Sequence, residues 1–137
     1  FEEAFNQLAS TPIIAPVYYI LSGVKPNQGV VLEMDRDSVF GVAQLDADNG
    51  IWYLVQTNYD RDLVDPKNDR RRIPAEERID AIGRENITPQ NLVSNILSLD
   101  PNLNKQTLET IIMSAQGDYL NTTCWRWENS QYSILTL

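Results

Sequence analysis

Polar side chains crowd the end of an otherwise apolar segment of this chain, at residues 56–61 (QTNYDR). The amide of Asn58 is a neutral hydrogen-bond donor, and such a donor can stabilise a developing oxyanion without the cost of desolvating a charge. Asn and Asp also commonly form the turn that ends a strand, and composition alone favours this structural role for Asn58 and Asp60. The run is therefore a candidate catalytic element with a plain structural alternative.

A second polar cluster lies at residues 69–72 (DRRR), inside a window that holds seven of the eleven basic residues. A guanidinium near a strand-end Asn can bind a carboxylate or a carbonyl, or lower the pKa of a nearby nucleophile. The alternative is a solvent-facing basic turn that leads into a helix, which is the more common role of such a run. Both interpretations stay open on this evidence.

A convincing nucleophile is missing from these 137 residues. There is no histidine, so this chain alone carries no Ser-His, Cys-His or His-metal mechanism. The single cysteine, Cys124, lies in a predicted strand without a neighbouring base to activate it, and we expect a structural thiol or half of a bridge to another chain. The residues predict part of an active site without its chemical centre, and neither a cofactor nor a metal.

The elements that must position the first cluster are strands. Phe1, Phe5 and Leu8 share one helical face, and the helix should end at Thr11, which precedes a proline. Runs rich in Ile, Val and Tyr predict strands at 13–21, 29–33, 39–45 and 51–57. The last of these is apolar on both faces, which predicts a central strand covered on both sides.

The second cluster should be positioned by a helix. Pro74 is expected to open that helix, and Thr88 is expected to cap another one that begins with Pro89. Residues 107–114 and 119–127 are predicted to form a hairpin. The order of elements predicts an α+β fold in which helices cover the faces of antiparallel sheets.

Composition excludes several classes of function. The 137 residues are 42% hydrophobic and 22% charged, which is typical of a folded chain, and the length fits one domain. A net charge of −8 repels phosphate backbones, so we expect no nucleic-acid partner. There is no apolar run of about 18 residues, so we expect no membrane span. The sequons at Asn86 and Asn121, together with a start at Phe1, predict a processed piece of a secretory glycoprotein.

Several stretches together resemble the N-acylethanolamine acid amidase and acid ceramidase family, and in particular the C-terminal part of the ceramidase β-subunit. The most specific stretch is residues 52–61 (WYLVQTNYDR), followed by the arginines of residues 69–72. Gln56 and Arg61 resemble the ceramidases more than the acylethanolamine amidases. Further similar stretches are residues 14–23, 29–31, 35–37, 85–87 and 102–105, so the resemblance spans most of residues 2–123.

This resemblance implies an N-terminal-nucleophile hydrolase with a four-layer αββα fold, of which residues 1–137 are one portion of a single domain. In such a family the precursor cleaves itself and a new N-terminal Cys attacks the amide, with its own α-amino group as the base. The implied roles are oxyanion binding for Asn58, a catalytic contribution for Arg71, and supporting substrate contacts for Tyr59 and Asp60. The chain departs from the family pattern at Met34, Asp62, Arg70 and Arg78.

The implied function is hydrolysis of N-acyl sphingosine to a fatty acid and a sphingoid base at acid pH, in the lysosome or after secretion. The nucleophile would come from an upstream part of the same precursor, so we expect this chain alone to be inactive. Two alternatives remain open: an N-acylethanolamine or bile-salt-type amidase on the same fold, and a non-catalytic lipid-binding or interaction module. Tyr18, Tyr19 and Trp52 are candidates for apolar lining, although core packing is their more common role.

Overall fold

The structure is a computed structural model that describes residues 1–128 and 131–134. The chain divides into two compact units, Phe1–Leu63 and Val64–Leu137, and each is described here by itself. Each unit combines helix with one small antiparallel sheet, so the predicted α+β class is confirmed. The single-domain assignment for residues 1–137 stays a prediction.

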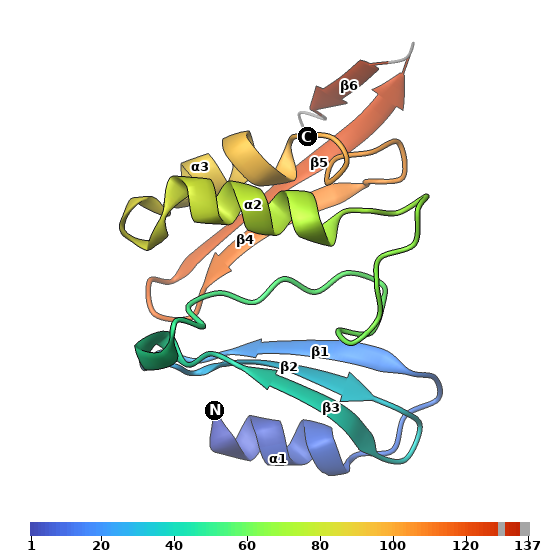
Figure 1. The fold of residues 1–137 in the computed structure, drawn as a ribbon, viewed down its shortest axis with the longest axis vertical. Coiled ribbons are helices and arrows are strands. Elements are labelled where there is room, and N and C mark those ends of the chain that lie inside the picture. The colour runs from blue at the N-terminus through green and yellow to red at the C-terminus, as the bar shows by residue number, and fades with distance from the viewer. Residues whose placement is uncertain (129–130, 135–137) are drawn as a thin grey trace. The chain divides into compact units, whose positions relative to one another are not determined.

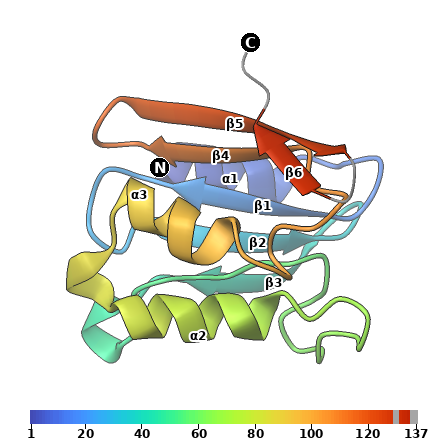
Figure 2. The ribbon, with the colours of Figure 1, turned by 90° about the horizontal axis from the view of Figure 1, so that it is seen from above.

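The first unit is a three-stranded antiparallel sheet with one α-helix and a short 3-10 helix, Ala47–Asn49. The strands lie in the order β1-β2-β3, with β2 in the centre (Figure 2). The first predicted strand begins later than expected because Pro16 cannot donate a backbone hydrogen bond to a ladder. The elements are α1 (Glu2–Ser10), β1 (Val17–Ser22), β2 (Gly29–Met34) and β3 (Val39–Gln44).

The central strand β2 is buried along its whole length. Alternate residues Val30, Leu32 and Met34 point to the face that α1 covers (Figure 1). The predicted apolar face of α1 packs there through Phe1, Phe5 and Leu8. The remaining face of β2 carries Val31 and Glu33, which are also buried.

The predicted strand at residues 51–57 is wrong. Ile51 makes one isolated bridge to Asp46, and the following residues run as an extended segment over the sheet face opposite α1 (Figure 1). Gly50, in the left-handed region with φ of 85°, turns the chain before this segment. A partly buried extended segment without a strand partner can have the same continuous apolar sequence as a central strand. The hydrophobic pattern therefore does not distinguish the two.

The described residues of the second unit form two α-helices, two shorter helical turns and a β-hairpin extended by a third strand. The predicted hairpin is confirmed, and a further strand that was not predicted pairs with its second arm. The elements are α2 (Arg72–Ile82), α3 (Pro89–Leu92) with a π-helical turn (Val93–Leu97), β4 (Glu109–Ser114), β5 (Tyr119–Glu128) and β6 (Gln131–Ile134).

Helix α2 begins at Arg72, two residues before the predicted start at Pro74. The buried carboxylate of Asp65 accepts a hydrogen bond from the Arg72 backbone N–H at 3.0 Å, and so supplies a cap from outside the helix. Pro74 lies in the first turn, where a backbone N–H has no partner within the helix. The second predicted helix start is confirmed: Thr88 Oγ1 accepts from the Asn91 N–H at 3.2 Å, and Asn91 Oδ1 accepts from the Thr88 N–H.

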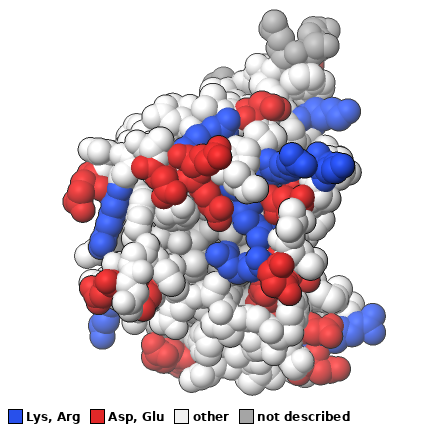
Figure 3. Space-filling view, viewed as in Figure 1, with Lys and Arg blue, Asp and Glu red and all other residues white. Residues whose placement is uncertain are grey.

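Acidic and basic side chains are interspersed on the face of the molecule shown in Figure 3. This distribution fits the ion pairs that the structure records close in sequence, such as Arg71 with Asp69 and Arg126 with Glu128. Within residues 1–128 and 131–134, none of the helices combines the length and the apolar character needed to cross a bilayer.

Candidate active site

Asn58 lies at the end of the extended segment that crosses the first sheet. Its side chain is exposed, and it lines a cavity of about 490 Å³ together with Asp60. The other walls of this cavity are mainly apolar and come from the sheet and the residue before it: Pro16, Val17, Tyr18, Met34 and Phe40. A neutral amide donor beside apolar walls suits an uncharged carbonyl attached to an alkyl chain.

A β-bulge shapes one wall of this cavity. Glu33 pairs with Gly41 and Met34 pairs with Val39, so Phe40 is an extra residue on β3. A bulge bends its strand and changes the direction of the side chain it carries. Phe40, the extra residue, is one of the residues that line the Asn58 cavity.

The residues around Asn58 form a segment closed by its own hydrogen bonds, residues 55–61, which we call the Asn58 segment. The amide of Gln56 donates to the carbonyl oxygens of Thr57 and Tyr59 at 3.0 and 2.9 Å. The guanidinium of Arg61 donates to the carbonyl oxygen of Val55 at 2.7 Å, which joins the two ends of the segment. Predicted site residue Tyr59 therefore contributes its backbone to the shape of the turn.

Asp60 is tied to the sheet. The hydroxyl of Tyr18 on β1 donates to Asp60 Oδ1 at 2.7 Å, across 42 positions in the sequence. Asn58 and Asp60 line the same cavity, and their predicted roles in catalysis and substrate binding stay predictions. The motif was predicted from sequence, but its anchor Tyr18 was expected to supply only apolar surface.

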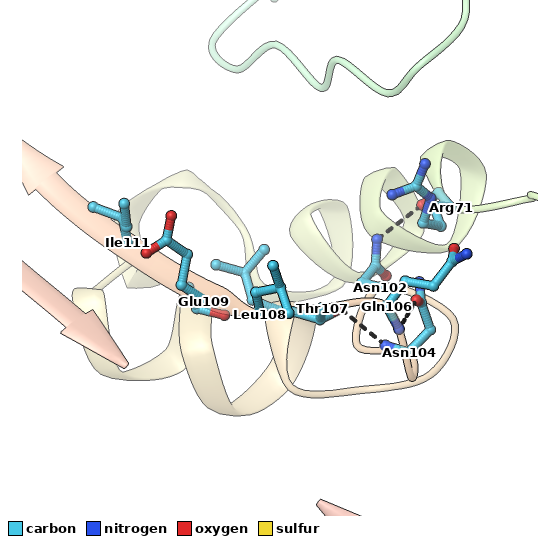
Figure 4. A pocket seen from close by; sticks show the side chains of 10 residues that line it. Arg71, Asn102, Asn104, Gln106, Thr107, Leu108, Glu109 and Ile111 are labelled. Atoms are coloured by element: carbon cyan, nitrogen blue, oxygen red, sulfur yellow. Dashed lines mark hydrogen bonds between the residues drawn. The ribbon is translucent and has the colours of Figure 1, made fainter. Parts of the chain in front are cut away.

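Arg71 lies in the second unit, directly before α2. Its guanidinium pairs with both carboxylate oxygens of Asp69, one contact being Nη2 to Oδ2 at 2.8 Å. A two-point pair fixes the plane of the guanidinium as well as its position. Arg71 borders a cavity of about 510 Å³ whose polar lining includes Asn102, Asn104 and Gln106 (Figure 4).

The backbone of Arg71 is held by a relay of two further side chains. Asn102 Nδ2 donates to the Arg71 carbonyl oxygen at 3.0 Å, and Asn102 Oδ1 accepts from Arg78 Nη1 at 2.9 Å (Figure 4 shows the first bond). Arg78 Nη2 also donates to the Asp100 carbonyl oxygen at 2.6 Å. Sequence reasoning missed this role for Asn102, because nothing in its local spacing links it to Arg71.

The remaining predicted residues lie apart from both cavities. Asn86 is exposed in a short 3-10 helix, Arg84–Asn86, and Asn121 is exposed on β5 opposite Ile112. Cys124 is a half-buried free cysteine on β5, opposite Glu109. In the described part of the chain, no three His, Cys, Asp or Glu side chains lie close enough together to hold a metal ion.

The chain is similar to two groups of enzymes. It is 42% identical to the N-acylethanolamine-hydrolyzing acid amidase of Oryctolagus cuniculus over 115 residues, which are 84% of this chain and 32% of that protein. It is also 42% identical to the acid ceramidase of Homo sapiens over 122 residues, 89% of this chain and 31% of that protein. The corresponding acid amidase of Mus musculus is 44% identical over 115 residues. No protein-family model matches the chain.

These relatives are lipid amide hydrolases, and the chain is thus related to that class of enzyme. More narrowly, it is related to the family of N-acylethanolamine-hydrolyzing acid amidases and acid ceramidases, as the sequence resemblance predicted. The chain spans about one third of the length of the curated relatives that it matches.

Proposed function

We propose that this chain is part of a lipid amide hydrolase in which the side-chain amide of Asn58 stabilises the oxyanion of the attacked carbonyl. The observation that carries the proposal is the position of Asn58, exposed beside a cavity with apolar walls. During attack the carbonyl oxygen gains negative charge, and a donor fixed beforehand stabilises this charge more than it stabilises the ground state. The similarity to acid amidases and acid ceramidases supports the same class of reaction.

The proposed reaction is cleavage of N-acyl sphingosine (ceramide) to a fatty acid and a sphingoid base. Arg71 is proposed to contribute a positive charge near the reacting amide, with Asp69 fixing the plane of its guanidinium. Tyr59 and Asp60 are proposed to contact substrate in supporting roles. Asp60 also borders the Asn58 cavity, which agrees with that assignment.

The nucleophile is proposed to lie outside these 137 residues, on an upstream part of the same precursor. Cys124, the one cysteine of this chain, is placed on a strand of the second unit with no histidine available as its base. The proposal includes an N-terminal Cys released by self-cleavage, its α-amino group as base, and a four-layer αββα fold completed by that upstream part. It also includes action in the lysosome or after secretion, with glycans on Asn86 and Asn121.

An N-acylethanolamine substrate is the second candidate, because the identity to the acylethanolamine amidases is as high as that to the ceramidases. Both substrates carry a fatty acyl amide, and the apolar walls of the Asn58 cavity suit either. Competition between ceramide and an N-acylethanolamine in the full-length enzyme decides between them. The substrate with the higher kcat/KM is the preferred one.

The test of the Asn58 role is Asn58→Ala in the full-length precursor. Loss of one oxyanion donor should lower kcat by about 10²–10³-fold and leave KM little changed. Asn6→Ala, which changes an exposed Asn on α1, is the matched control and should keep wild-type kcat. Unchanged turnover and precursor cleavage in Asn58→Ala would refute the oxyanion role. Absence of turnover in the wild-type precursor itself would instead favour a non-catalytic lipid-binding module.

A further inference from the structure

Glu33 is a buried carboxylate on the central strand of the first sheet, in a strand otherwise composed of apolar residues and glycine. It is 6% exposed. A buried carboxylate is unfavourable unless hydrogen bonds replace its lost water. Its Oε1 accepts a hydrogen bond from the backbone N–H of Arg61 at 3.0 Å. The acidic side chain therefore binds the end of the Asn58 segment, 28 positions away in the sequence.

A second hydrogen bond also ties the Asn58 segment to the sheet. Tyr18 lies opposite Glu33 in the β1–β2 register, so both side chains project from the same face. Tyr18 binds Asp60 and Glu33 binds Arg61, which are consecutive residues. The segment is thus held at two adjacent points, just after Asn58, by a cross-strand pair.

The neighbouring strand β3 also leaves room for the Glu33 carboxylate. Gly41 lies opposite Glu33 in the β2–β3 register. A Cβ atom built on Gly41 would stand 2.9 Å from Glu33 Cδ and closer still to its Oε2, well inside contact distance. Any larger residue at position 41 would therefore push the carboxylate from its place.

We propose that Glu33 is a positioning residue for amide hydrolysis, holding Asn58 in register with the reacting carbonyl through the Arg61 backbone. Glu33 binds the protein backbone, so its effect on the reaction passes through the Asn58 segment. Hydrogen bonds from the side chains of Gln56 and Arg61 hold residues 55–61 together. A displacement of Arg61 should therefore displace Asn58 as well. This inference rests on the proposed oxyanion role of Asn58.

The test compares Glu33→Leu with Glu33→Gln in the full-length precursor, with an N-acyl sphingosine carrying a fluorescent acyl chain as substrate. A donor displaced by about 1 Å costs up to about 10²-fold in rate, so Glu33→Leu should lower kcat by about 10–10²-fold with KM little changed. Gln keeps an acceptor oxygen of the same shape and should restore most of the kcat. Glu3→Leu, at an exposed position on α1, is the matched control.

A double variant separates positioning from a general effect on folding. If Glu33 acts through Asn58, Glu33→Leu should cause little further loss of kcat in an Asn58→Ala background. An equal further loss would overturn the inference, as would wild-type kcat in Glu33→Leu while Asn58→Ala is impaired. Wild-type kcat in Asn58→Ala itself would instead overturn the proposed function.

Gly41→Ala keeps the test valid if Glu33→Leu does not fold. This variant leaves Glu33 in place and displaces its carboxylate by steric contact. A folded Gly41→Ala protein should show the same fall in kcat. Adding Glu33→Ala to Gly41→Ala removes the carboxylate and relieves the steric contact, but it should not restore turnover. A folded Gly41→Ala protein with wild-type kcat would contradict the inference.

Discussion

Tyr18 and Glu33 lie directly opposite each other on β1 and β2, and they bind the consecutive residues Asp60 and Arg61. One bond comes from a phenol hydroxyl to a side chain, and the other from a backbone N–H to a carboxylate. The two contacts have different chemistry but constrain the same short segment. Asp60 and Arg61, which follow Asn58 closely in the chain, are therefore anchored to side chains of a sheet, and the proposed positioning of Asn58 depends on these two anchors.

The hydroxyl of Tyr18 can be tested separately from its ring. Tyr18→Phe should lower kcat by about tenfold, because loss of a hydrogen bond to a charged group is worth about 1.5–3 kcal/mol and part of it loosens the segment. The matched control is Tyr19→Phe, since Tyr19 packs on the other face against the core of β2. Steady-state kinetics of both variants check this; equal kinetics for the two would contradict a role for the Tyr18–Asp60 bond.

The relay behind Arg71 predicts a second effect. Asn102→Leu leaves the Arg71 carbonyl without its Asn102 donor and Arg78 Nη1 without its Asn102 acceptor, and should destabilise the protein by about 1–3 kcal/mol. Asn95→Leu, at an exposed position in the π-helical turn, is the control. Chemical denaturation of the full-length protein measures both. Equal stability of the Asn102 and Asn95 variants would show that the relay contributes nothing to folding.

Thr88 has two separable roles, as the cap of α3 and as the third residue of the Asn86 sequon. Thr88→Ala should remove any glycan on Asn86 and lower the free energy of unfolding by about 0.5–2 kcal/mol, because the Asn91 N–H loses its acceptor. Thr88→Ser keeps both the hydroxyl and the sequon, so it should resemble the wild type. Intact mass before and after deglycosylation, with thermal unfolding of each variant, checks the two roles. An unchanged mass on deglycosylation would exclude glycans on Asn86 and Asn121.

The phenol of Tyr132 on β6 predicts that the stability of the fold falls at alkaline pH. Burial, followed by the nearby negative charge of Asp100, raises the pKa of the Tyr132 phenol above its ordinary value of 10.0. The folded state therefore holds this proton more tightly than the unfolded state, so the contribution to stability is full below pH 10 and is lost as pH rises through the folded pKa. Ultraviolet absorbance can be followed as pH rises in the wild type and in Tyr132→Phe. The variant should lack one tyrosine ionisation, the one that occurs at a pH above the ordinary tyrosine value. A difference spectrum that titrates at the ordinary value would contradict the shift.

Much of the local structure could be predicted from sequence because its signals are local. The capping box at Thr88, the helix at the N-terminus and the hairpin of β4 and β5 each depend on residues close together in the chain. The α2 start was misplaced because its cap, Asp65, lies seven positions away and outside any capping pattern. The segment after Ile51 does not form the predicted strand, because an apolar sequence does not reveal whether a neighbouring strand is present to pair with it.

The candidate site shows the same division between local and distant information. Asn58 and Asp60 were singled out by an unusual polar run, and the structure places both at one cavity, while their functional roles stay predictions. Their anchors were missed because Tyr18 and Glu33 are brought to them by sheet register, which the hydrophobic pattern specifies only approximately. One signal was present in the sequence: Glu33 is a lone charge inside the otherwise uncharged strand β2, and such a residue requires a partner.

The extra residue Phe40 has a consequence for how the shape of the Asn58 cavity can change. It sits next to Gly41, yet its side chain forms a wall of the cavity while Gly41 makes space for the Glu33 carboxylate. Lining the cavity and making space for Glu33 are thus separate roles of adjacent residues. A substitution at residue 40 can change the cavity while residue 41 remains glycine. If the cavity holds the acyl chain as proposed, its breadth is a property that evolution or a protein engineer can adjust at residue 40 without changing the residues that hold the Asn58 segment.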